Sequence, residues 1–452
     1  QTRLLDEYEQ GFSIKDMFQI GGTGICSKRD HVVFHKTKES LLELLKDFST
    51  LEPSELRRKY DIKDTEGWKL GMAIENVKKN QHELEKYIVW CQYRPFDYRW
   101  TYYTGKSKSF IAYPRGDVFK HMLPPPPPPT NPKTPNQTRK NIALNTPRQL
   151  KNNDKSWTQC FISSCINDQG LSSGGNGAGV NYPLYQFRDP NYTENFTPEF
   201  RSFIDKHYNH SFEPLEILGY IYALLYSPNY RKRYEGFLKI DYPKILFTKN
   251  KDLFMVLSLL GIELIGLHVL NQESLNYSFE KLKDATIGES YYIEEHERNP
   301  IIKKPSHNEQ RLYINHSAYF SGVSQEIYDY RIGGYCVLDK YLKSHKNESC
   351  DFDHVTRIIK VIACTIEIQK TLGFLTSDLP HLKGNDSKAL MQEILQNPPP
   401  PPFNTNTALI LSRQAKAIGD FEFDAAFISK EASDNNIYRR GGGTAFPLFC
   451  IT

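Results

Sequence analysis

Arginine residues set among aromatic residues are the side chains of this sequence with the clearest capacity for chemistry. The segment YRPFDYRWTYY (93–103) holds Arg94, Arg99 and one carboxylate, Asp97. A guanidinium can bind a carboxylate through two parallel hydrogen bonds, and it can bind phosphate oxygens or a guanine edge in the same way. Residues 94 and 99 lie on opposite faces of an extended strand. We therefore expect one arginine to pair with Asp97 inside the sheet and the other to be available to a binding partner.

Two further segments concentrate basic residues on a chain whose total charge is nearly balanced. The chain has 57 basic and 53 acidic residues, a net charge of +4, so only local clustering can indicate a polyanionic partner. Residues 226–251 carry seven basic and two acidic residues, an excess of five, among tyrosines and phenylalanines. Residues 133–155 carry six basic residues and one acidic residue. Basic side chains interleaved with aromatic ones suit a phosphate backbone, although a charged run is also typical of a solvated face.

The sequence lacks the common motifs of catalysis. It contains neither the Asn/Asp-Pro-Pro-Tyr/Phe tetrapeptide that amino-group methyltransferases need, nor a Walker A sequence, an HExxH pair or a GxSxG elbow. GGNGAG (174–179) does not have the GxGxxG spacing, and we expect a hairpin loop there. Cys160, Cys165, His207 and His210 have poor spacing for zinc. The sequence therefore predicts no catalytic residue and no metal site in this chain.

The hydrophobic pattern predicts a mixed α/β (α+β) fold, in which helices flank a β-rich centre. Apolar residues at three- and four-residue spacing predict helices within 36–90 and over 213–226, 251–270 and 351–372. Aromatic and β-branched residues predict two strands within 88–113, with TGKSKS between them as a connecting loop, and further strands at NIALNT and QCFISSCI.

The apolar stretch 253–270 is long enough to raise the question of a membrane span. It contains Glu263, whose charge would be costly inside a bilayer, so we expect a buried core helix and no membrane partner. Eight cysteines are scattered without CxxC pairs, which indicates reduced thiols and a cytoplasmic protein. A turn at Gly333–Gly334 is expected to lead into a helix in which Asp339 and Lys343 form an ion pair.

The chain also contains an internal repeat. NIALNTPRQ (141–149) recurs as NTALILSRQ (406–414), and the later pieces FISSCIND and YPLY recur in the same order as FISKEASD and FPLF. Each copy follows a run of prolines, a sequence typical of an exposed polyproline II segment. We therefore expect residues 398–452 to be a second copy of the module at 124–185.

Eight segments in one order resemble a known family, the C-terminal specificity region of Type ISP restriction–modification enzymes. The resemblance covers residues 13–372, and the segments are KDMFQIGGTGICSKRDHVVF, YRPFDYRWTYY, FIAYPRGDVFKHML, NIALNTPRQ, YPLYQF, ALLYSPNYRKRYEGFLKIDYPKI, LFMVLSLLGIELIGLHVL and VSQEIYDYRIGGYCVLDKYLK. Members of that family are single bacterial chains that join a nuclease, a translocase motor, an adenine-N6 methyltransferase and a target-recognition domain. The two proline runs and the second module depart from the family pattern.

The resemblance implies an organisation and a function. Residues 1–90 would be a helical linker after an absent methyltransferase domain, 91–375 the target-recognition domain, and 376–452 a partial duplicate of 124–185. The chain would be a fragment of a longer enzyme, consistent with the missing initiator methionine. It would recognise a sequence of double-stranded DNA for adenine methylation and for cleavage of unmodified DNA. It would need no cofactor itself, whereas the parent polypeptide would need S-adenosylmethionine, ATP and Mg²⁺.

The resemblance also implies a set of DNA contacts drawn from the basic segments. Arg148 and Gln149 suit a guanine and an adenine respectively, and the same pair recurs as Arg413 and Gln414. The alternative for this pair is a cap at the end of a strand. The predicted DNA-binding residues are Arg99, Arg115, Lys120, Arg148, Gln149, Arg231, Lys232, Lys239 and Arg331.

Two other functions are compatible with the same sequence. The proline runs could dock into aromatic grooves of a partner, which would make the chain a protein-interaction scaffold. The extra module could also mark an inert remnant of a restriction–modification enzyme. The sequence does not specify the DNA sequence recognised, the role of the second module or the oligomeric state.

Overall fold

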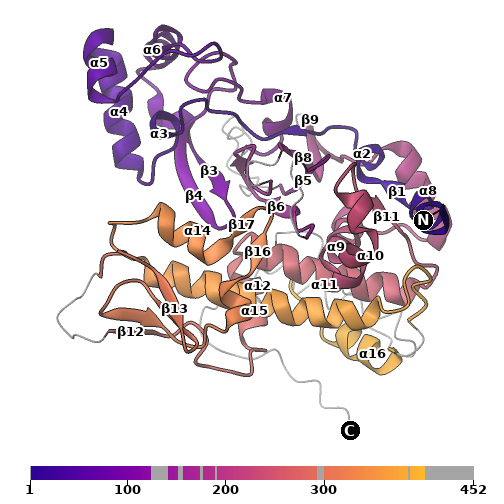
Figure 1. Cartoon of the computed structure of the whole chain (residues 1–452). Coiled ribbons are helices and arrows are strands. Elements are labelled where there is room, and N and C mark those ends of the chain that lie inside the picture. The colour runs from indigo at the N-terminus through magenta and orange to yellow at the C-terminus, as the bar shows by residue number, and fades with distance from the viewer. Residues whose placement is uncertain are drawn as a thin grey trace, which may run out of the picture.

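Short sheets and helices alternate along the chain, and the mixed α/β fold class predicted from the sequence is confirmed (Figure 1). The computed structural model describes residues 2–123, 141–150, 156–173, 177–188, 191–292, 300–384 and 387–402. Of the predicted second module (398–452), only the proline run 398–402 is described; residues 403–452, with Arg413, Gln414 and Cys450, lie outside the described residues, as does the first proline run (124–129).

The N-terminal helices pack around a β-hairpin. In α4, Leu41, Leu44, Leu45 and Phe48 are buried at three- and four-residue spacing, and Thr37 caps the helix by accepting from the amide of residue 40. The elements of this part are α3 (Asp30–Val33), α4 (Lys38–Thr50), α5 (Pro53–Lys59), α6 (Leu70–Lys79), the 3-10 helix η1 (Leu84–Tyr87), β3 (Ile88–Arg94), β4 (Asp97–Tyr102) and α7 (Gly116–Phe119).

The hairpin turns earlier than the sequence predicts. Pro95 and Phe96 form the turn between β3 and β4, and Phe96 takes a left-handed backbone conformation with φ of 62°. Proline suits a turn because its φ is fixed. The segment around TGKSKS is a surface loop after β4, and Tyr113 makes only an isolated bridge with Cys26.

The centre of the molecule holds small sheets. A four-stranded sheet has the order β2-β8-β5-β6, and β7 adds in parallel to β3. Figure 1 shows β5, β6 and β8 between the N-terminal helices and the C-terminal elements. The strands are β2 (Gly22–Thr23), β5 (Ala143–Pro147), β6 (Phe161–Ser163), β7 (Ile166–Asn167), β8 (Gly179–Pro183), β9 (Tyr185–Arg188) and β10 (Asn191–Glu194).

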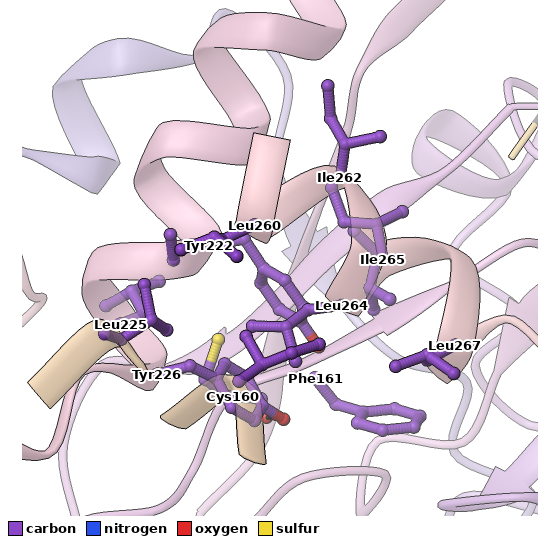
Figure 2. Packing of buried hydrophobic residues seen from close by; sticks show 14 of the residues in the cluster. Cys160, Phe161, Tyr222, Leu225, Tyr226, Leu260, Ile262, Leu264, Ile265 and Leu267 are labelled. Atoms are coloured by element: carbon purple, nitrogen blue, oxygen red, sulfur yellow. Dashed lines mark hydrogen bonds between the residues drawn. The ribbon is translucent and has the colours of Figure 1, made fainter. Parts of the chain in front are cut away.

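The apolar stretch forms a buried helix, α11, as predicted. Every residue from 253 to 268 is buried, and the helix crosses α9 so closely that a Cβ on Gly261 would lie 1.8 Å from the carbonyl oxygen of Gly219. Figure 2 shows Leu260 and Leu264 of α11 beside Tyr222 of α9. The elements around it are α1 (Thr2–Glu9), β1 (Phe12–Ser13), α2 (Ile14–Met17), α8 (Pro198–Tyr208), α9 (Pro214–Tyr226), α10 (Pro228–Leu238), β11 (Lys244–Ile245), α11 (Lys251–His268) and α12 (Gln272–Phe279).

No single helix in the described ranges is long and apolar enough to cross a membrane. Helices α11 and α12 together have sufficient length and composition, but they bend by 113° at their junction.

The C-terminal part combines a four-stranded sheet with the long helix α15. The predicted ion pair of Asp339 and Lys343 is present, at 2.8 Å. The elements are β12 (Ser290–Tyr292), β13 (Ser306–Asn308), β14 (Arg311–Tyr313), β15 (Ala318–Phe320), α13 (Gln325–Tyr328), β16 (Arg331–Ile332), β17 (Tyr335–Cys336), α14 (Val337–Ser344), α15 (Phe352–Leu375) and α16 (Lys388–Gln396).

Two hydrophobic cores hold these elements together, and neither follows the predicted boundary at residue 90. The larger core includes Tyr8 and Met17 from the start of the chain. The smaller core joins the N-terminal helices to Ala143 of β5 and Ile166 of β7. Residues 1–90 are therefore packed into both cores, and the division of the chain into 1–90, 91–375 and 376–452 stays a prediction.

Candidate nucleic-acid interface

An ion pair inside the protein fastens the β3–β4 hairpin. Arg99 donates from Nε and Nη2 to the two oxygens of Asp97, each over 2.7 Å. These residues are 6% and 2% exposed. Ser344 at the end of α14 donates to Asp97 Oδ2 over 3.1 Å, so the pair also joins the hairpin to the C-terminal helices. Burial by itself would raise the pKa of the Asp97 carboxyl, but the neighbouring His345 and Arg99 lower it to about 2.

The other arginine of the hairpin is held in the same way, which corrects the prediction that one of the two would be available to a partner. Arg94 donates from Nη1 to Asp168 Oδ1 over 2.6 Å, and both side chains are largely buried. The guanidinium of Arg94 also lies 3.8 Å from the centre of the Tyr93 ring. Since Arg99 is buried in its own ion pair, we remove it from the candidate DNA contacts.

Several loops next to α10 bring together six of the nine predicted contacts. We call the solvent-facing side of this region the recognition face; it is built on residues 148–150, 157–158, 169–173, 177–179 and 331–334 together with the partly or fully exposed basic residues of α10 and its C-terminal end, and only some of these residues reach solvent. Its predicted contacts are Arg148, Gln149, Arg231, Lys232, Lys239 and Arg331.

Backbone contacts join the first of these loops to its neighbours. The amide of Leu150 donates to the carbonyl of Lys239 over 2.9 Å, which places the end of β5 beside the end of α10. On the other side, a Cβ on Gly177 would lie 3.0 Å from the carbonyl oxygen of Gln149. Gln149 is exposed between these two contacts.

The β16–β17 hairpin docks onto the same surface through its glycine turn. Gly333 donates to the carbonyl of Thr158 over 2.9 Å, and the Thr158 hydroxyl donates back to the carbonyl of Gly333 over 3.0 Å. A Cβ on Gly333 would lie 1.6 Å from the carbonyl oxygen of Ser172, and φ at this glycine is 61°. The turn therefore requires glycine at position 333 for both its conformation and its close approach. This contact positions Arg331, which is exposed and donates to the carbonyl of Gly334 over 2.8 Å.

A buried amide cluster supports the loops from below. Asn145 and Asn167 both donate to Asn181 Oδ1 over 2.8 Å. Ser172 donates to Asn145 Oδ1 over 2.5 Å. These four side chains are 0% exposed, so their hydrogen bonds fix the loop 169–173 to the central sheet in one arrangement.

Several basic residues on and beside the recognition face are neutralised by acidic neighbours. Arg148 pairs with Asp241 over 3.2 Å, with both side chains about two-thirds exposed (65% and 64%). Lys239 pairs with Glu235 over 3.2 Å, one helical turn away. Lys232 is exposed and has no ion pair with a described acidic residue. Exposed pairs of this kind contribute little to stability and can exchange their partner for a phosphate.

Arg231 is partly buried, and its contacts are with neighbouring protein groups. Its Nε donates to the carbonyl of Leu225 over 2.6 Å, and its guanidinium lies 4.4 Å from the centre of the Tyr226 ring. It also lies 5.7 Å from the ring of Trp157. Burial, with the nearby charge of Arg231 as a smaller cause, lowers the pKa of His268 to about 3. These contacts place Arg231 against two buried aromatic side chains, Tyr226 and Trp157.

Arg115 and Lys120 form a separate basic site at the turn around α7. Both are exposed, and Arg115 takes a left-handed backbone conformation with φ of 57° and ψ of 47°. A non-glycine residue rarely adopts this conformation, which costs roughly 1–2 kcal/mol. Such strain is concentrated at functional sites.

Two lysines that were not predicted as DNA contacts lie beside this turn. Lys106 and Lys108 are exposed in the loop after β4, and a Cβ on Gly116 would lie 3.0 Å from the carbonyl oxygen of Gly105. The signal for these two lysines was present in the TGKSKS sequence, because lysines in a loop are suited to phosphate contacts.

A groove of about 740 Å³ lies away from all nine predicted contacts. Its lining includes Gln19, Glu194, Arg201 and Asp205. Arg201 lies 3.5 Å from Glu194 and 3.6 Å from Asp205, so its charge is balanced locally and does not favour a polyanion. Within the described residues, no group of three or more His, Cys, Asp or Glu side chains is placed to hold a metal ion.

The fold and its exposed basic loops define a mixed α/β module suited to recognising a polyanion. The family model of the Type ISP C-terminal specificity domain matches residues 16–368. The chain belongs to this family.

Solved structures agree with this family assignment. The chain is similar to a nuclease-deletion mutant of the Type ISP restriction–modification enzyme LlaGI in complex with a DNA substrate mimic (TM-score 0.54, 19% identity, 82% of this chain and 34% of that one). It is also similar to the ATP-dependent Type ISP restriction–modification enzyme LlaBIII bound to DNA, with a TM-score of 0.57 and 19% identity over 81% of this chain and 24% of that one. A third similar structure is a DrdV–DNA complex, with a TM-score of 0.54 and 18% identity over 79% of this chain and 36% of that one. No curated protein matches the chain by sequence.

Proposed function

We propose that this specificity domain recognises a defined sequence of duplex DNA through the recognition face. The family match over residues 16–368 is the observation that carries the proposal. The description of all three similar structures as DNA complexes or complexes with a DNA mimic supports the choice of ligand. The gathering of six predicted contacts from three separate chain segments, 148–149, 231–239 and 331, supports the choice of surface.

The residues of the face divide into two kinds by their chemistry. Gln149 is exposed at a loop and has the donor and acceptor that read an adenine edge. Lys232 on α10 and Lys239 directly after its C-terminal end present single positive charges, which suit phosphate oxygens and carry no sequence information. Arg148 and Arg331 can serve either purpose. The α7 turn, with Arg115 and Lys120, would extend the phosphate contacts.

The chain spans about a quarter to a third of the length of these solved relatives (24%, 34% and 36%). We therefore propose that a longer parent polypeptide supplies an upstream methyltransferase domain and the other activities. In that parent, S-adenosylmethionine would donate the methyl group to adenine N6, and ATP and Mg²⁺ would support cleavage of unmodified DNA. The enzyme would act in the cytoplasm, where its DNA lies.

The salt dependence of DNA binding tests the proposal. We expect the purified chain to bind random duplexes with an association constant that falls steeply with salt. A plot of the logarithm of this constant against the logarithm of the salt concentration should have a slope of about −0.9 for each phosphate neutralised. Selection from a random duplex library should then enrich one sequence. A flat salt response, or no enriched sequence, would refute DNA recognition by this chain.

Replacing Arg115 with glycine should weaken DNA binding while leaving the fold intact. Glycine adopts the left-handed conformation of residue 115 without strain, so the thermal midpoint should stay level or rise slightly. Loss of one phosphate contact should reduce the salt slope by about 1. Arg115→Lys keeps the charge and the strain and serves as the control. Equal DNA binding by wild type and Arg115→Gly would exclude the α7 turn from the interface.

A further inference from the structure

A proline segment at residues 398–402 lies along the helices α11 and α12, well past the end of the family match at residue 368. Helix α16 leads into it, with Met391 and Leu395 buried in the larger core. We call residues 397–402 the proline strap. Unlike a free linker, the strap is fixed to the domain by specific contacts at both of its ends.

Two side-chain donors hold the strap by its backbone. The hydroxyl of Tyr277 donates to the carbonyl of Asn397 over 2.6 Å. The amide Nδ2 of Asn271 donates to the carbonyl of Pro402 over 2.8 Å. These carbonyls are five residues apart, or roughly 16 Å in a polyproline II helix with a rise of about 3.1 Å per residue. Proline has no N–H, so such carbonyls can be satisfied only by outside donors such as these.

The burial of the prolines has the period of a polyproline II helix. Pro399 and Pro402 are buried, whereas Pro398, Pro400 and Pro401 are intermediate. Three residues per turn place residues 399 and 402 on the same side of such a helix. That side faces the protein: the nearest atom of Pro402 lies 3.8 Å from the position of a Cβ on Gly266 in α11.

Each donor also has contacts with residues outside the strap. Asn271 accepts from the amide of Ser274 over 3.0 Å with its Oδ1, as the cap of α12, and this orients its Nδ2 outward. The ring of Tyr277 lies 3.7 Å from Lys281 Nζ, and Lys281 in turn lies 3.3 Å from a carboxylate oxygen of the buried Glu263. An aromatic side chain and a side-chain amide that donate to backbone carbonyls are features of polyproline recognition.

We propose that the surface formed by Gly266, Asn271 and Tyr277 is a polyproline II binding site, occupied by the strap of the same chain and able to take a proline-rich segment of another protein when the strap is released. Recognition is through backbone carbonyls and every third proline, so the ligand class is any proline-rich segment of six or more residues. The proposal is independent of DNA recognition, because the site and the recognition face share no residue.

Binding of a labelled peptide in trans tests the site in the full-length chain. Pro399→Asp with Pro402→Asp should expel the strap, since both positions are buried and an unpaired carboxylate is costly to bury. The probe is a fluorescein-labelled Asn-Pro-Pro-Pro-Pro-Pro-Phe peptide, followed by anisotropy. We expect the double variant to bind it about tenfold or more tighter than wild type does, because the tethered strap competes through its high effective concentration.

Two matched substitutions assign that binding to the groove. Adding Tyr277→Phe removes only a hydroxyl, and Asn271→Asp removes one donor while keeping the cap acceptor of α12. Together they should weaken peptide binding about tenfold or more. A double proline variant that melts like wild type but binds the peptide no better would overturn the proposal. Peptide binding that survives the loss of both donors would do the same.

A second measurement does not depend on expelling the strap. In the otherwise unchanged chain, Tyr277→Phe with Asn271→Asp should speed amide hydrogen exchange in α16, whose C-terminal end is tied down by the strap. Unchanged exchange in α16 would show that these donors do not hold the strap and would overturn the proposal. DNA binding should be the same in all of these variants, which separates this test from that of the proposed function.

Discussion

Replacing Asp97 with alanine is expected to lower the free energy of unfolding by about 3–5 kcal/mol, because it leaves the buried guanidinium of Arg99 without its carboxylate. Both hydrogen bonds of the pair measure 2.7 Å, and little solvent reaches either residue. The loss also removes the link to Ser344, so the hairpin should detach from α14. Denaturant unfolding of the two proteins measures the difference.

The matched control is an ion pair at the surface. Asp241→Ala removes the partner of Arg148, but both side chains are about two-thirds exposed (65% and 64%). We expect this variant to unfold within about 1 kcal/mol of wild type. An equal decrease in the free energy of unfolding in the two variants would contradict the view that the Asp97 pair stabilises the protein because it is buried.

The Asp97 pair also predicts how stability depends on pH. The pKa of the Asp97 carboxyl is about 2 in the folded protein, below its usual value of 3.8. The folded state therefore binds this proton less readily than the unfolded chain does, and the contribution is present above the unfolded pKa. It should be lost as the pH falls from about 4 through about 2, and the loss should be smaller in Asp97→Ala.

The hairpin shows where prediction from the sequence ended. The segment predicted a bidentate pair between Asp97 and one of its two arginines, but it did not show which one, and Arg99 was placed among the predicted DNA contacts. The acidic partner of Arg94 is Asp168, 74 residues away and brought near by the parallel pairing of β7 with β3. A strand pattern gives the face on which a side chain lies, but it does not give the neighbour that covers that face.

Local charge counts failed for the same reason. Residues 226–251 have an excess of five positive charges when counted alone. In the folded chain, α1 supplies Glu7 to Arg233 and Glu9 to Lys244. A segment more than 200 residues away therefore neutralises part of the cluster, and the exposed positive charge is smaller than the sequence suggests.

The helices were predicted more accurately than the loops. The expected ranges 213–226, 251–270 and 351–372 correspond to α9 (Pro214–Tyr226), α11 (Lys251–His268) and α15 (Phe352–Leu375). Their apolar residues recur along one continuous stretch, so burial is encoded locally. The recognition face depends instead on contacts such as that of Gly333 with Ser172, which no local pattern contains.

Reversing two charges on the recognition face should weaken DNA binding by on the order of 100-fold and should lower the salt slope by about 2, on the basis of roughly 1–3 kcal/mol for each contact. The variant combines Lys232→Glu on α10 with Arg331→Glu at the docked hairpin. Both side chains are exposed and neither pairs with a described acidic residue, so the reversal should leave the thermal midpoint nearly unchanged. Anisotropy of a labelled duplex at two salt concentrations measures both effects.

A control with the same change in net charge separates a local contact from general attraction. Lys78→Glu with Lys79→Glu alters two exposed lysines in the last turn of α6, which belongs to the N-terminal helices and not to the recognition face. General attraction of a basic protein to DNA would weaken equally in both double variants. A recognition face predicts that the salt slope changes in the first variant alone, since only phosphates in contact release their counterions. Equal losses in the two variants would place the DNA elsewhere on the molecule.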